Sequence, residues 1–311
     1  MEDPHVVVAG AGAMGSLFGG LLAEAGLRVT LLARRAEHVG AIRQHGLRIV
    51  GEGGERSVPV GAATTVSDIA PADIVLVQCK ASATRAVAES IAPLMGRGSL
   101  AVSFQNGLGN EEIMAEALGS ETVLGGLTSL GATLEAPGVV RNYAALPTVV
   151  GELGGGLSSR ATTLAALLSA HGIPTTASSD ILAEKWRKLM LNVAMSATSG
   201  LTGLTIGEVA GLPALADVAR RAMDEAAAVA EACGVPLPQA TRYAIFDGIV
   251  TSGAARNKTS MRRDIEAGRP SEVEAIYLSV IERGRARGIA TPTLEALAAL
   301  VLGVEAAQRA A

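Results

Sequence analysis

A lysine, an asparagine and a serine recur every four residues in a mostly apolar stretch of the chain. Lys188, Asn192 and Ser196 would share one face of a helix. A lysine ammonium on such a face can donate a proton to a carbonyl oxygen while that carbonyl is reduced. The alternative is a structural pair between Lys188 and Glu184, which lie four residues apart in the favourable orientation. That pair would leave Asn192 in apolar company, so Lys188 is a candidate proton donor.

A glycine-rich loop near the N-terminus has the pattern of a dinucleotide site. The segment 10–15 reads Gly-Ala-Gly-Ala-Met-Gly, directly after an apolar run and at the start of a predicted helix. Its first glycine permits a tight turn, its second lets the backbone approach a pyrophosphate, and its third allows close helix packing. Free N–H groups at the helix start favour phosphate. A plain glycine-rich turn is the alternative, and the predicted cofactor-binding residues are Gly10, Ala11, Gly12, Ala13, Met14 and Gly15.

The end of the second predicted strand indicates which dinucleotide binds. NAD sites usually place an acidic residue there to bind the ribose 2′-hydroxyl. Residues 31–35 read Leu-Leu-Ala-Arg-Arg and contain no acid. A guanidinium grips phosphate in a fork, so Arg34 and its neighbour suit the 2′-phosphate of NADP(H). The alternative is a solvated basic turn.

Polar residues also follow two further predicted strands. Lys80 comes after the apolar run 74–79, and Asn106 after 100–104. The carboxyl ends of strands in a doubly wound sheet line the ligand crevice, although either residue could equally be an ordinary loop residue. Farther along, Ser271 and Glu274 have the spacing of a capping box. Glu272 would lie in the first turn of that helix, where the helix dipole favours an acid.

The alternation of elements predicts the fold. Up to about residue 178, apolar strand-like runs alternate with helical segments, which is typical of a parallel sheet covered on both faces. Beyond it, only helical patterns follow. The prediction is an α/β Rossmann-type doubly wound parallel sheet followed by an all-α C-terminal domain, divided as residues 1–178 and 179–311. The helices expected in the second part are 180–199, 213–233, 238–252, 257–267, 271–287 and 292–310.

Composition excludes several classes of protein. The 311 residues carry 26 Lys and Arg against 30 Asp and Glu, a net charge of −4 with no basic run, so no nucleic-acid partner is expected. No apolar run reaches the roughly 18 residues that a membrane span needs. Two distant cysteines form neither a disulfide framework nor a zinc-ligand pattern, so no metal is expected. The N-terminus lacks a signal-peptide pattern, and we expect a cytoplasmic protein. Its amphipathic helices are compatible with a homodimer.

Taken together, these motifs resemble the ketopantoate reductase family over nearly the whole chain and in the family's order. The resemblance rests on the glycine loop, Lys80, Phe-Gln-Asn106-Gly-Leu-Gly, Lys-Trp-Arg-Lys188 with Asn192, and Ser260-Met-x-x-Asp264 followed by Gly-Arg-x-x-Glu272. It implies an NADP domain of Rossmann type followed by an all-α domain. It also implies NADPH-dependent reduction of a small 2-oxo acid, most simply 2-dehydropantoate to (R)-pantoate, for pantothenate and coenzyme A synthesis.

The resemblance also implies roles for individual residues. Lys188 would be the general acid, and Glu272 would hold the nicotinamide ribose and orient the lysine or substrate. Asn106 would lie beside nicotinamide and substrate, with Lys80 and Arg34 near the cofactor. The segment 128–131, which ends at Gly131, would pass the nicotinamide. Implied substrate-binding residues are Asn106, Lys188, Asn192, Ser196, Asn257 and Ser260.

Three positions depart from the family pattern. Ser196 and Ile206 stand where members commonly carry asparagines, and Tyr277-Leu278 stands where members often have Asn-Gly. Lost amide groups would weaken recognition of a substrate hydroxyl, since each hydrogen bond is worth about 0.5–1.5 kcal/mol. The alternatives are therefore a D-2-hydroxyacid (mandelate-like) dehydrogenase of the same superfamily, a β-hydroxyacid dehydrogenase, or a non-catalytic NADP-binding sensor.

Overall fold

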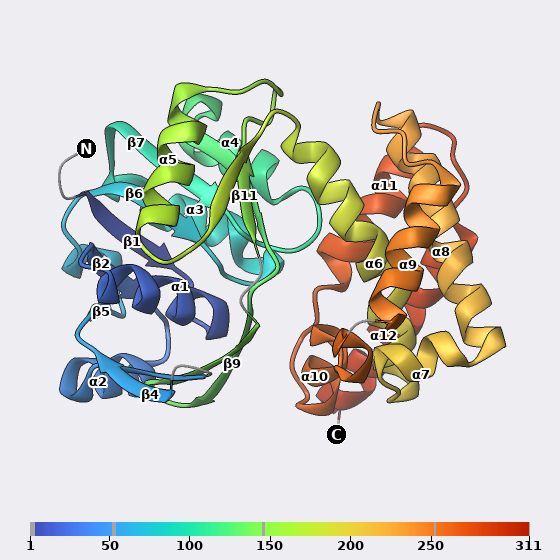
Figure 1. The fold of residues 1–311 in the computed structure, drawn as a ribbon, viewed down its shortest axis with the longest axis horizontal. Coiled ribbons are helices and arrows are strands. Elements are labelled where there is room, and N and C mark those ends of the chain that lie inside the picture. The colour runs from blue at the N-terminus through green and yellow to red at the C-terminus, as the bar shows by residue number, and fades with distance from the viewer. Residues whose placement is uncertain (1–3, 52–53, 145–146, 252, 311) are drawn as a thin grey trace. The chain divides into compact units, whose positions relative to one another are not determined.

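The computed structural model describes residues 4–51, 54–144, 147–251 and 253–310. The chain forms two compact units (Figure 1). The sheet unit comprises residues 1–105 and 110–182, and the helical unit comprises residues 106–109 and 183–311. The short segment 106–109 thus belongs to the helical unit, although the residues before and after it belong to the sheet unit.

The sheet unit is built on a mostly parallel sheet of eight strands in the order β12-β11-β8-β7-β6-β1-β2-β5. The pairs β1–β2, β1–β6 and β6–β7 are parallel, whereas β11 runs antiparallel to β8. This confirms the Rossmann-type prediction, with one antiparallel pair added. The strands are β1 (His5–Ala9), β2 (Arg28–Leu32), β5 (Gly61–Ala63), β6 (Ala72–Val77), β7 (Met95–Ser103), β8 (Val123–Thr128), β11 (Thr148–Gly151) and β12 (Thr175–Ser178).

Two apolar clusters cover the faces of this sheet. One face is covered by α1 (Ala13–Glu24), α2 (Ala36–His45) and α5 (Ser159–Ala170). These helices pack over Val6, Val8 and the other strand side chains that point to this face. On the other, α3 (Thr84–Ile91) and α4 (Asn110–Leu118) pack over Val7 and its equivalents. Strand β1 is buried along its whole length because alternate side chains enter both clusters. Its carboxyl end is therefore fixed where the glycine loop begins.

A second sheet of four strands, in the order β4-β3-β10-β9, was missed by the sequence prediction. Its strands are β3 (Leu47–Gly51), β4 (Gly54–Val58), β9 (Gly131–Ala136) and β10 (Val139–Ala144). Leu47 and Ile49 join the same apolar cluster as α1. The signals are weak, since Leu47 and Ile49 alternate with Arg48 but also with the apolar Val50, and the clearest mark is Pro137-Gly138, a turn dipeptide between β9 and β10.

The helical unit has no strand among its described residues. Its helices are α6 (Ile181–Thr202), α7 (Ile206–Gly211), α8 (Pro213–Ala232), α9 (Gln239–Thr251), α10 (Ser260–Glu266), α11 (Ser279–Arg285) and α12 (Pro292–Ala310). They enclose a core of their own, built mainly from Ala, Val, Leu and Met side chains. None of the helices in the described ranges is long and apolar enough to cross a membrane. Within the described ranges, Cys79 and Cys233 form no disulfide.

Two predictions about how helices begin in this unit were wrong. The helix expected over 257–267 begins only at Ser260, because the Thr259 side chain accepts the Arg262 N–H and caps it there. The capping box of Ser271 with Glu274 does not form, because Ser271 N–H donates instead to the Glu305 carboxylate of α12 at 2.8 Å. Glu305 is distant in sequence, so local spacing could not reveal it.

Candidate functional site

The glycine loop joins β1 to α1 with a backbone conformation that needs glycine. Gly10 has φ of +101°, and a Cβ there would lie 2.5 Å from the backbone nitrogen of Cys79. Either feature alone disfavours any other residue. The Gly10 and Ala11 N–H groups bond to Leu32 O, which ties the loop to the end of β2. The chain thus turns sharply at the carboxyl edge of the sheet, and the N-terminus of α1 lies at that edge.

The loop fits a dinucleotide phosphate. A Cβ at Gly12 would meet no protein atom within 4 Å, so the loop presents bare backbone there. α1 begins at Ala13 without a side-chain cap, and its first-turn N–H groups can therefore receive an anion. Nearby, at the end of β6, both amide atoms of the Gln78 side chain are buried and have no hydrogen-bond partner among the described residues. Such a buried amide is stabilised only by an added polar group.

The other cofactor candidates of the sheet unit lie at strand ends. Arg34 follows β2, is exposed, and has no hydrogen-bond or ion-pair partner in the part of the chain that the structure describes. Lys80 follows β6 and is also exposed. Gly131 opens β9, where a Cβ would lie 2.3 Å from the Tyr143 ring. The first two are at the carboxyl edge of the large sheet, as expected from sequence.

A buried histidine, which was not among the predicted site residues, supports the glycine loop. His38 of α2 is 1 % exposed, and its Nδ1 accepts the Gly138 N–H at 2.9 Å. The Nε2 must then carry the proton and donate to the Ser16 hydroxyl at 3.0 Å, and that hydroxyl donates to Ala11 O. Burial, with Arg35 nearby, lowers the pKa of His38 and keeps it neutral. This chain of hydrogen bonds could not be predicted from the sequence, because a single histidine does not reveal whether it will be buried or which groups it will bond to.

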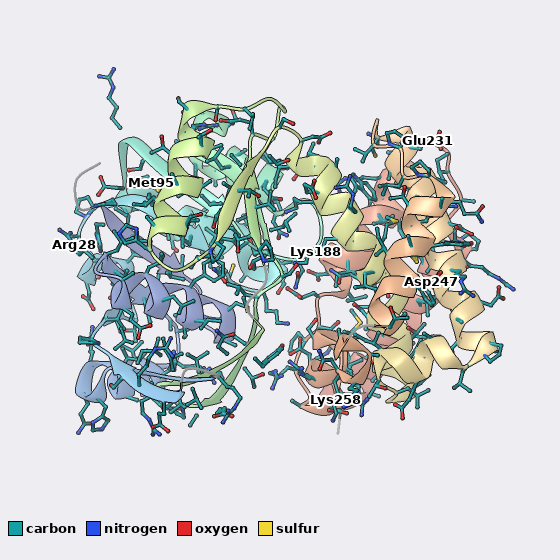
Figure 2. The ribbon with its side chains drawn as sticks, in the orientation of Figure 1. Arg28, Met95, Lys188, Glu231, Asp247 and Lys258 are labelled. Carbon is teal, nitrogen blue, oxygen red and sulfur yellow. The ribbon has the colours of Figure 1, made fainter. Side chains whose placement is uncertain are left out.

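The helical unit brings together three of the predicted site residues. Lys188 Nζ on α6 donates to Asn106 Oδ1 at 2.9 Å, and Asn106 Nδ2 donates to Glu272 Oε2 at 2.9 Å. Figure 2 marks Lys188 on α6. The amide orientation is the only one that suits both neighbours, since the ammonium can only donate and the carboxylate only accept. The Asn106 amide thus joins a cation to an anion. The alternative partner, Glu184, pairs with Arg187 at 2.7 Å instead.

The surroundings of Lys188 tune its acidity. Burial, and after it the charge of the buried Lys185 one turn earlier, lower the pKa of the Lys188 ammonium to about 8, while Glu272 opposes both effects. The usual value is 10.5. At neutral pH the amine therefore remains protonated yet gives up its proton far more readily than an exposed lysine. A protonated group poised in this way can serve as a general acid.

The segment that carries Asn106 is fastened to the π-helical turn Glu274–Leu278. Ala275 O accepts the Leu108 N–H at 3.1 Å and the Ser279 hydroxyl at 2.6 Å. Gly107 has φ of +82°, and a Cβ there would lie 2.2 Å from Ala275 O. Only glycine allows this approach. The turn therefore fixes Asn106 at the point where it meets Lys188 and Glu272.

Asn192 and Ser196 follow Lys188 on α6, as predicted. Asn192 is partly buried and Ser196 is 4 % exposed. Within the described ranges neither side chain has a hydrogen-bond partner. Two uncommitted polar groups one turn apart on an apolar helix can therefore bind a polar ligand.

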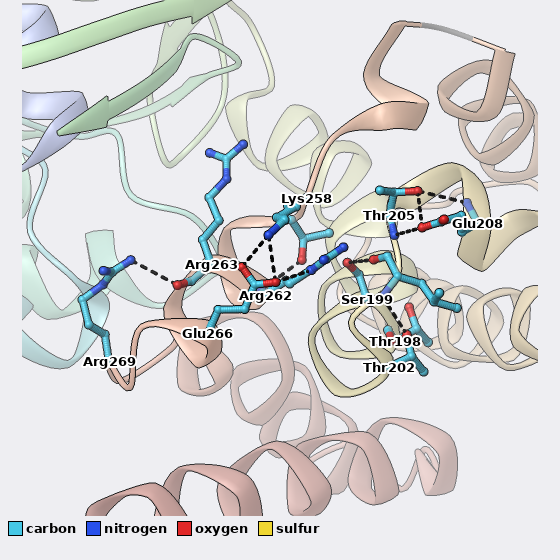
Figure 3. A network of polar contacts seen from close by, with 12 residues as sticks. Thr198, Ser199, Thr202, Thr205, Glu208, Lys258, Arg262, Arg263, Glu266 and Arg269 are labelled. Carbon is cyan, nitrogen blue, oxygen red and sulfur yellow. Dashed lines mark hydrogen bonds and ion pairs between the residues drawn. The ribbon is translucent and has the colours of Figure 1, made fainter. Parts of the chain in front are cut away.

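Asn257 and Ser260 lie at the start of α10, and both are exposed. Asn257 O accepts the Ile206 N–H at 3.2 Å, while its side chain has no partner among the described residues. Figure 3 shows two ion pairs of the same segment, in which Lys258 and Arg262 both bind Glu266. These contacts hold α10 in place, but within the described ranges no hydrogen bond joins Asn257 or Ser260 to Lys188.

All three departures from the family pattern are buried, and two of them, Ile206 and Tyr277, are committed to the core of the helical unit. Ile206 is 9 % exposed and packs in the core of the helical unit. Tyr277 is fully buried, and its hydroxyl bonds to the backbone of α6. Neither side chain is free to contact a ligand. Of the three positions, only Ser196 carries a polar side chain that has no hydrogen-bond partner among the described residues.

Comparison with known proteins assigns the family. The family model described as ketopantoate reductase PanE/ApbA matches residues 6–155, and the model of that family's C-terminal part matches residues 180–305. The chain belongs to the ketopantoate reductase family. The Rossmann-type unit and the helical unit that follows it are those expected from the resemblance in sequence.

Relatives cover nearly the whole chain. A 2-dehydropantoate 2-reductase of Halobacterium salinarum is 36 % identical over 96 % of this chain and 97 % of its own length. That of Archaeoglobus fulgidus is 34 % identical over 98 % and 99 %. Among solved structures, a ketopantoate reductase family member from Ralstonia eutropha has a TM-score of 0.90 at 33 % identity, covering 98 % of this chain and 99 % of that one. A D-mandelate dehydrogenase in ternary complex with NADH and anilino(oxo)acetate has a TM-score of 0.93 at 27 % identity, with the same coverage.

Proposed function

We propose that this protein is an NADPH-dependent reductase of a 2-oxo acid, and that its substrate is 2-dehydropantoate, reduced to (R)-pantoate on the route to pantothenate and coenzyme A. The observation that carries the proposal is the Lys188–Asn106–Glu272 chain of hydrogen bonds, in which a lysine of lowered pKa is held by an amide and a carboxylate. Family membership and the activity named for the relatives support it.

Each polar residue of the site has a separate task. Lys188 gives its proton to the keto oxygen, and Asn106 aims the ammonium at it. Glu272 keeps the Asn106 amide oriented and stabilises the ammonium. Asn192, Ser196, Asn257 and Ser260 bind the carboxylate and hydroxyl of the substrate. Bound NADPH supplies the hydride that the keto carbon receives.

The cofactor would be held by the sheet unit. The glycine loop, residues 10–15, receives the pyrophosphate, and Arg34 binds the 2′-phosphate as a fork. Lys80, Asn106, Gly131 and Glu272 complete the set of cofactor-binding residues. We propose accordingly that residues 1–178 form the NADP-binding domain and residues 179–311 the substrate and catalytic domain. We also propose that the protein is cytoplasmic and forms a homodimer. Analytical ultracentrifugation, which measures the mass of the particle in solution, tests the homodimer.

The test follows NADPH absorbance while a panel of 2-oxo acids is offered to the purified protein. The proposal expects turnover with ketopantoate and a kcat for Lys188→Ala that is lower by about 10²–10⁴-fold, while the variant still binds NADPH. An unchanged kcat in this variant would remove the lysine's role.

The second candidate is a D-2-hydroxyacid dehydrogenase of the mandelate type. The structural likeness to D-mandelate dehydrogenase favours it, as does Ser196, which offers a smaller polar group than an amide. If this candidate is right, bulkier 2-oxo acids such as phenylglyoxylate should be reduced at higher initial rates than ketopantoate in the same panel. A sensor without catalysis expects tight NADPH binding and no turnover with any of them.

A further inference from the structure

The hydroxyl of Tyr277 is inserted into the hydrogen-bond ladder of α6. It donates to Val193 O at 2.8 Å and accepts the Ala197 N–H at 3.0 Å. These two backbone groups lie four residues apart, and a regular α-helix would bond them directly to each other. A side chain that enters the ladder in this way is a recognised cause of local helix distortion.

The insertion lies beside the two uncommitted polar side chains of α6. Val193 directly follows Asn192, and Ala197 directly follows Ser196. Tyr277 Oη also lies 3.4 Å from Asn192 O. The hydroxyl therefore bonds to the α6 backbone between the turn that carries Asn192 and the turn that carries Ser196. Lys188 precedes the insertion by more than one turn.

The ring of Tyr277 cannot move to relieve this contact. Tyr277 is fully buried in the core of the helical unit and belongs to the π-helical turn whose Ala275 O holds Leu108. The turn is thus joined to the Asn106 segment at one residue and to α6 at another. Because the ring is held in place by packing, we expect the backbone of α6 to adjust to the hydroxyl, and the hydroxyl to determine the distance between the two turns that it contacts.

We infer that Tyr277 is a positioning residue that determines substrate recognition, because its hydroxyl sets the spacing and direction of the Asn192 amide and the Ser196 hydroxyl toward the polar groups of the 2-oxo acid. The inference rests on the proposed function. It assigns Tyr277 no contact with the substrate and no part in proton transfer. Its effect falls on substrate binding, since Lys188 lies more than one turn before the residues that Tyr277 contacts.

The experiment compares wild type, Tyr277→Phe and the control Tyr243→Phe. The first substitution would keep the ring and let Val193 O and Ala197 N–H bond directly. Tyr243 also lies in the helical unit, and its hydroxyl bonds to Asp224 at 3.0 Å, so the control removes a tyrosine hydroxyl away from α6. We expect Tyr277→Phe to raise KM for ketopantoate about tenfold, the equivalent of about one hydrogen bond, with kcat within twofold. The control should leave both unchanged.

Two further readouts separate positioning from general stability. The Kd of pantoate for the NADP⁺ complex, measured by calorimetry, should rise in parallel with KM, whereas the Kd of NADPH should not change. In the Ser196→Ala background, Tyr277→Phe should raise KM by clearly less than it does alone, because the two residues act through the same contact. Hydrogen exchange over residues 189–202 should also change in Tyr277→Phe without any ligand.

The outcomes are distinguishable. If wild type turns over ketopantoate and Tyr277→Phe has the same KM and pantoate Kd, the inference is overturned and the proposed function stands. Equal losses in kcat and NADPH binding, or additive effects with Ser196→Ala, would also overturn it and leave a purely structural role. No turnover or pantoate binding in wild type would overturn the proposed function and the substrate role of Tyr277 together.

Discussion

Lys188 combines two properties that oppose each other at the level of the single residue. Its surroundings lower its pKa to about 8, which suits proton donation, but they also make its charged form costly. A base whose pKa is lower in the folded than in the unfolded state destabilises the fold while it is charged. This cost is fully present below pH 8 and disappears as the pH rises to the unfolded value near 10.5.

The stability of a Lys188→Met variant tests this cost. Removing the charge should raise the free energy of unfolding at pH 7 by about 1–2 kcal/mol, because the relieved cost exceeds the lost hydrogen bond to Asn106. The gain should shrink between pH 8 and 10.5, while turnover is lost at every pH. Denaturant unfolding of both proteins at pH 7 and pH 10 measures this difference in the free energy of unfolding. A variant less stable than wild type at pH 7 would show that the ammonium is well solvated.

Arg34 is expected to select the cofactor. Arg34→Gln should raise the KM for NADPH by about 10–100-fold and leave that for NADH nearly unchanged, since a charged hydrogen bond to the 2′-phosphate is worth about 1.5–3 kcal/mol. The matched control is Arg28→Gln, an exposed arginine at the opposite end of β2. Equal effects of Arg34→Gln on both cofactors would contradict a specific phosphate contact.

Among the elements, the π-helical turn Glu274–Leu278 does most to place the site, through its contacts with the 106–109 segment and with α6. The sequence predicted an ordinary helix over 271–287 here. A π turn has no local signature in the residues, because it arises where distant groups compete for its carbonyls. Tyr277 and Ala275 contact residues 84 and 167 positions away, respectively. The resemblance in sequence predicted that Lys188, Asn106 and Glu272 belong to one site, and their hydrogen bonds join them, but the sequence did not predict this support.

Gly107→Ala tests the fastening of the Asn106 segment. The new Cβ would meet the Ala275 backbone and force an unfavourable positive φ, so kcat/KM should fall at least tenfold and the melting temperature should drop. Gly288→Ala is the control, because Gly288 has φ of +70° but no atom within 4 Å of its Cβ position. It should lose stability by about 1–2 kcal/mol and keep its activity. Equal kinetic losses in both variants would refute the specific role of Gly107.

At the scale of the whole molecule, the chain folds around separate cores, two on the faces of the large sheet and one in the helical unit. The change from alternating strands and helices to helices alone predicted a division of the sequence near residue 178. The membership of residues 106–109 did not follow from sequence, because Gly107 and Leu108 join the helical unit through single contacts with Ala275. The second sheet was overlooked because its short strands alternate only weakly.

Cofactor binding should stabilise the folded chain by mass action. NADPH at about 100 times its Kd should add about 2.7 kcal/mol, which corresponds to a rise in melting temperature of roughly 5–10 °C for a unit of this size. The same concentration should shift Arg34→Gln by less. Calorimetry with and without NADPH measures both shifts, and an unshifted wild-type transition at saturating NADPH would contradict a dinucleotide site.

The pH dependence of kcat/KM for reduction of ketopantoate by NADPH tests most directly whether the Lys188 ammonium is the proton donor. The donor must be protonated, and the pKa of Lys188 is about 8. If Lys188 is the donor, kcat/KM has a plateau below pH 8 and falls about tenfold per pH unit above it. A profile that stays level to pH 10, or that rises above pH 8, would contradict it.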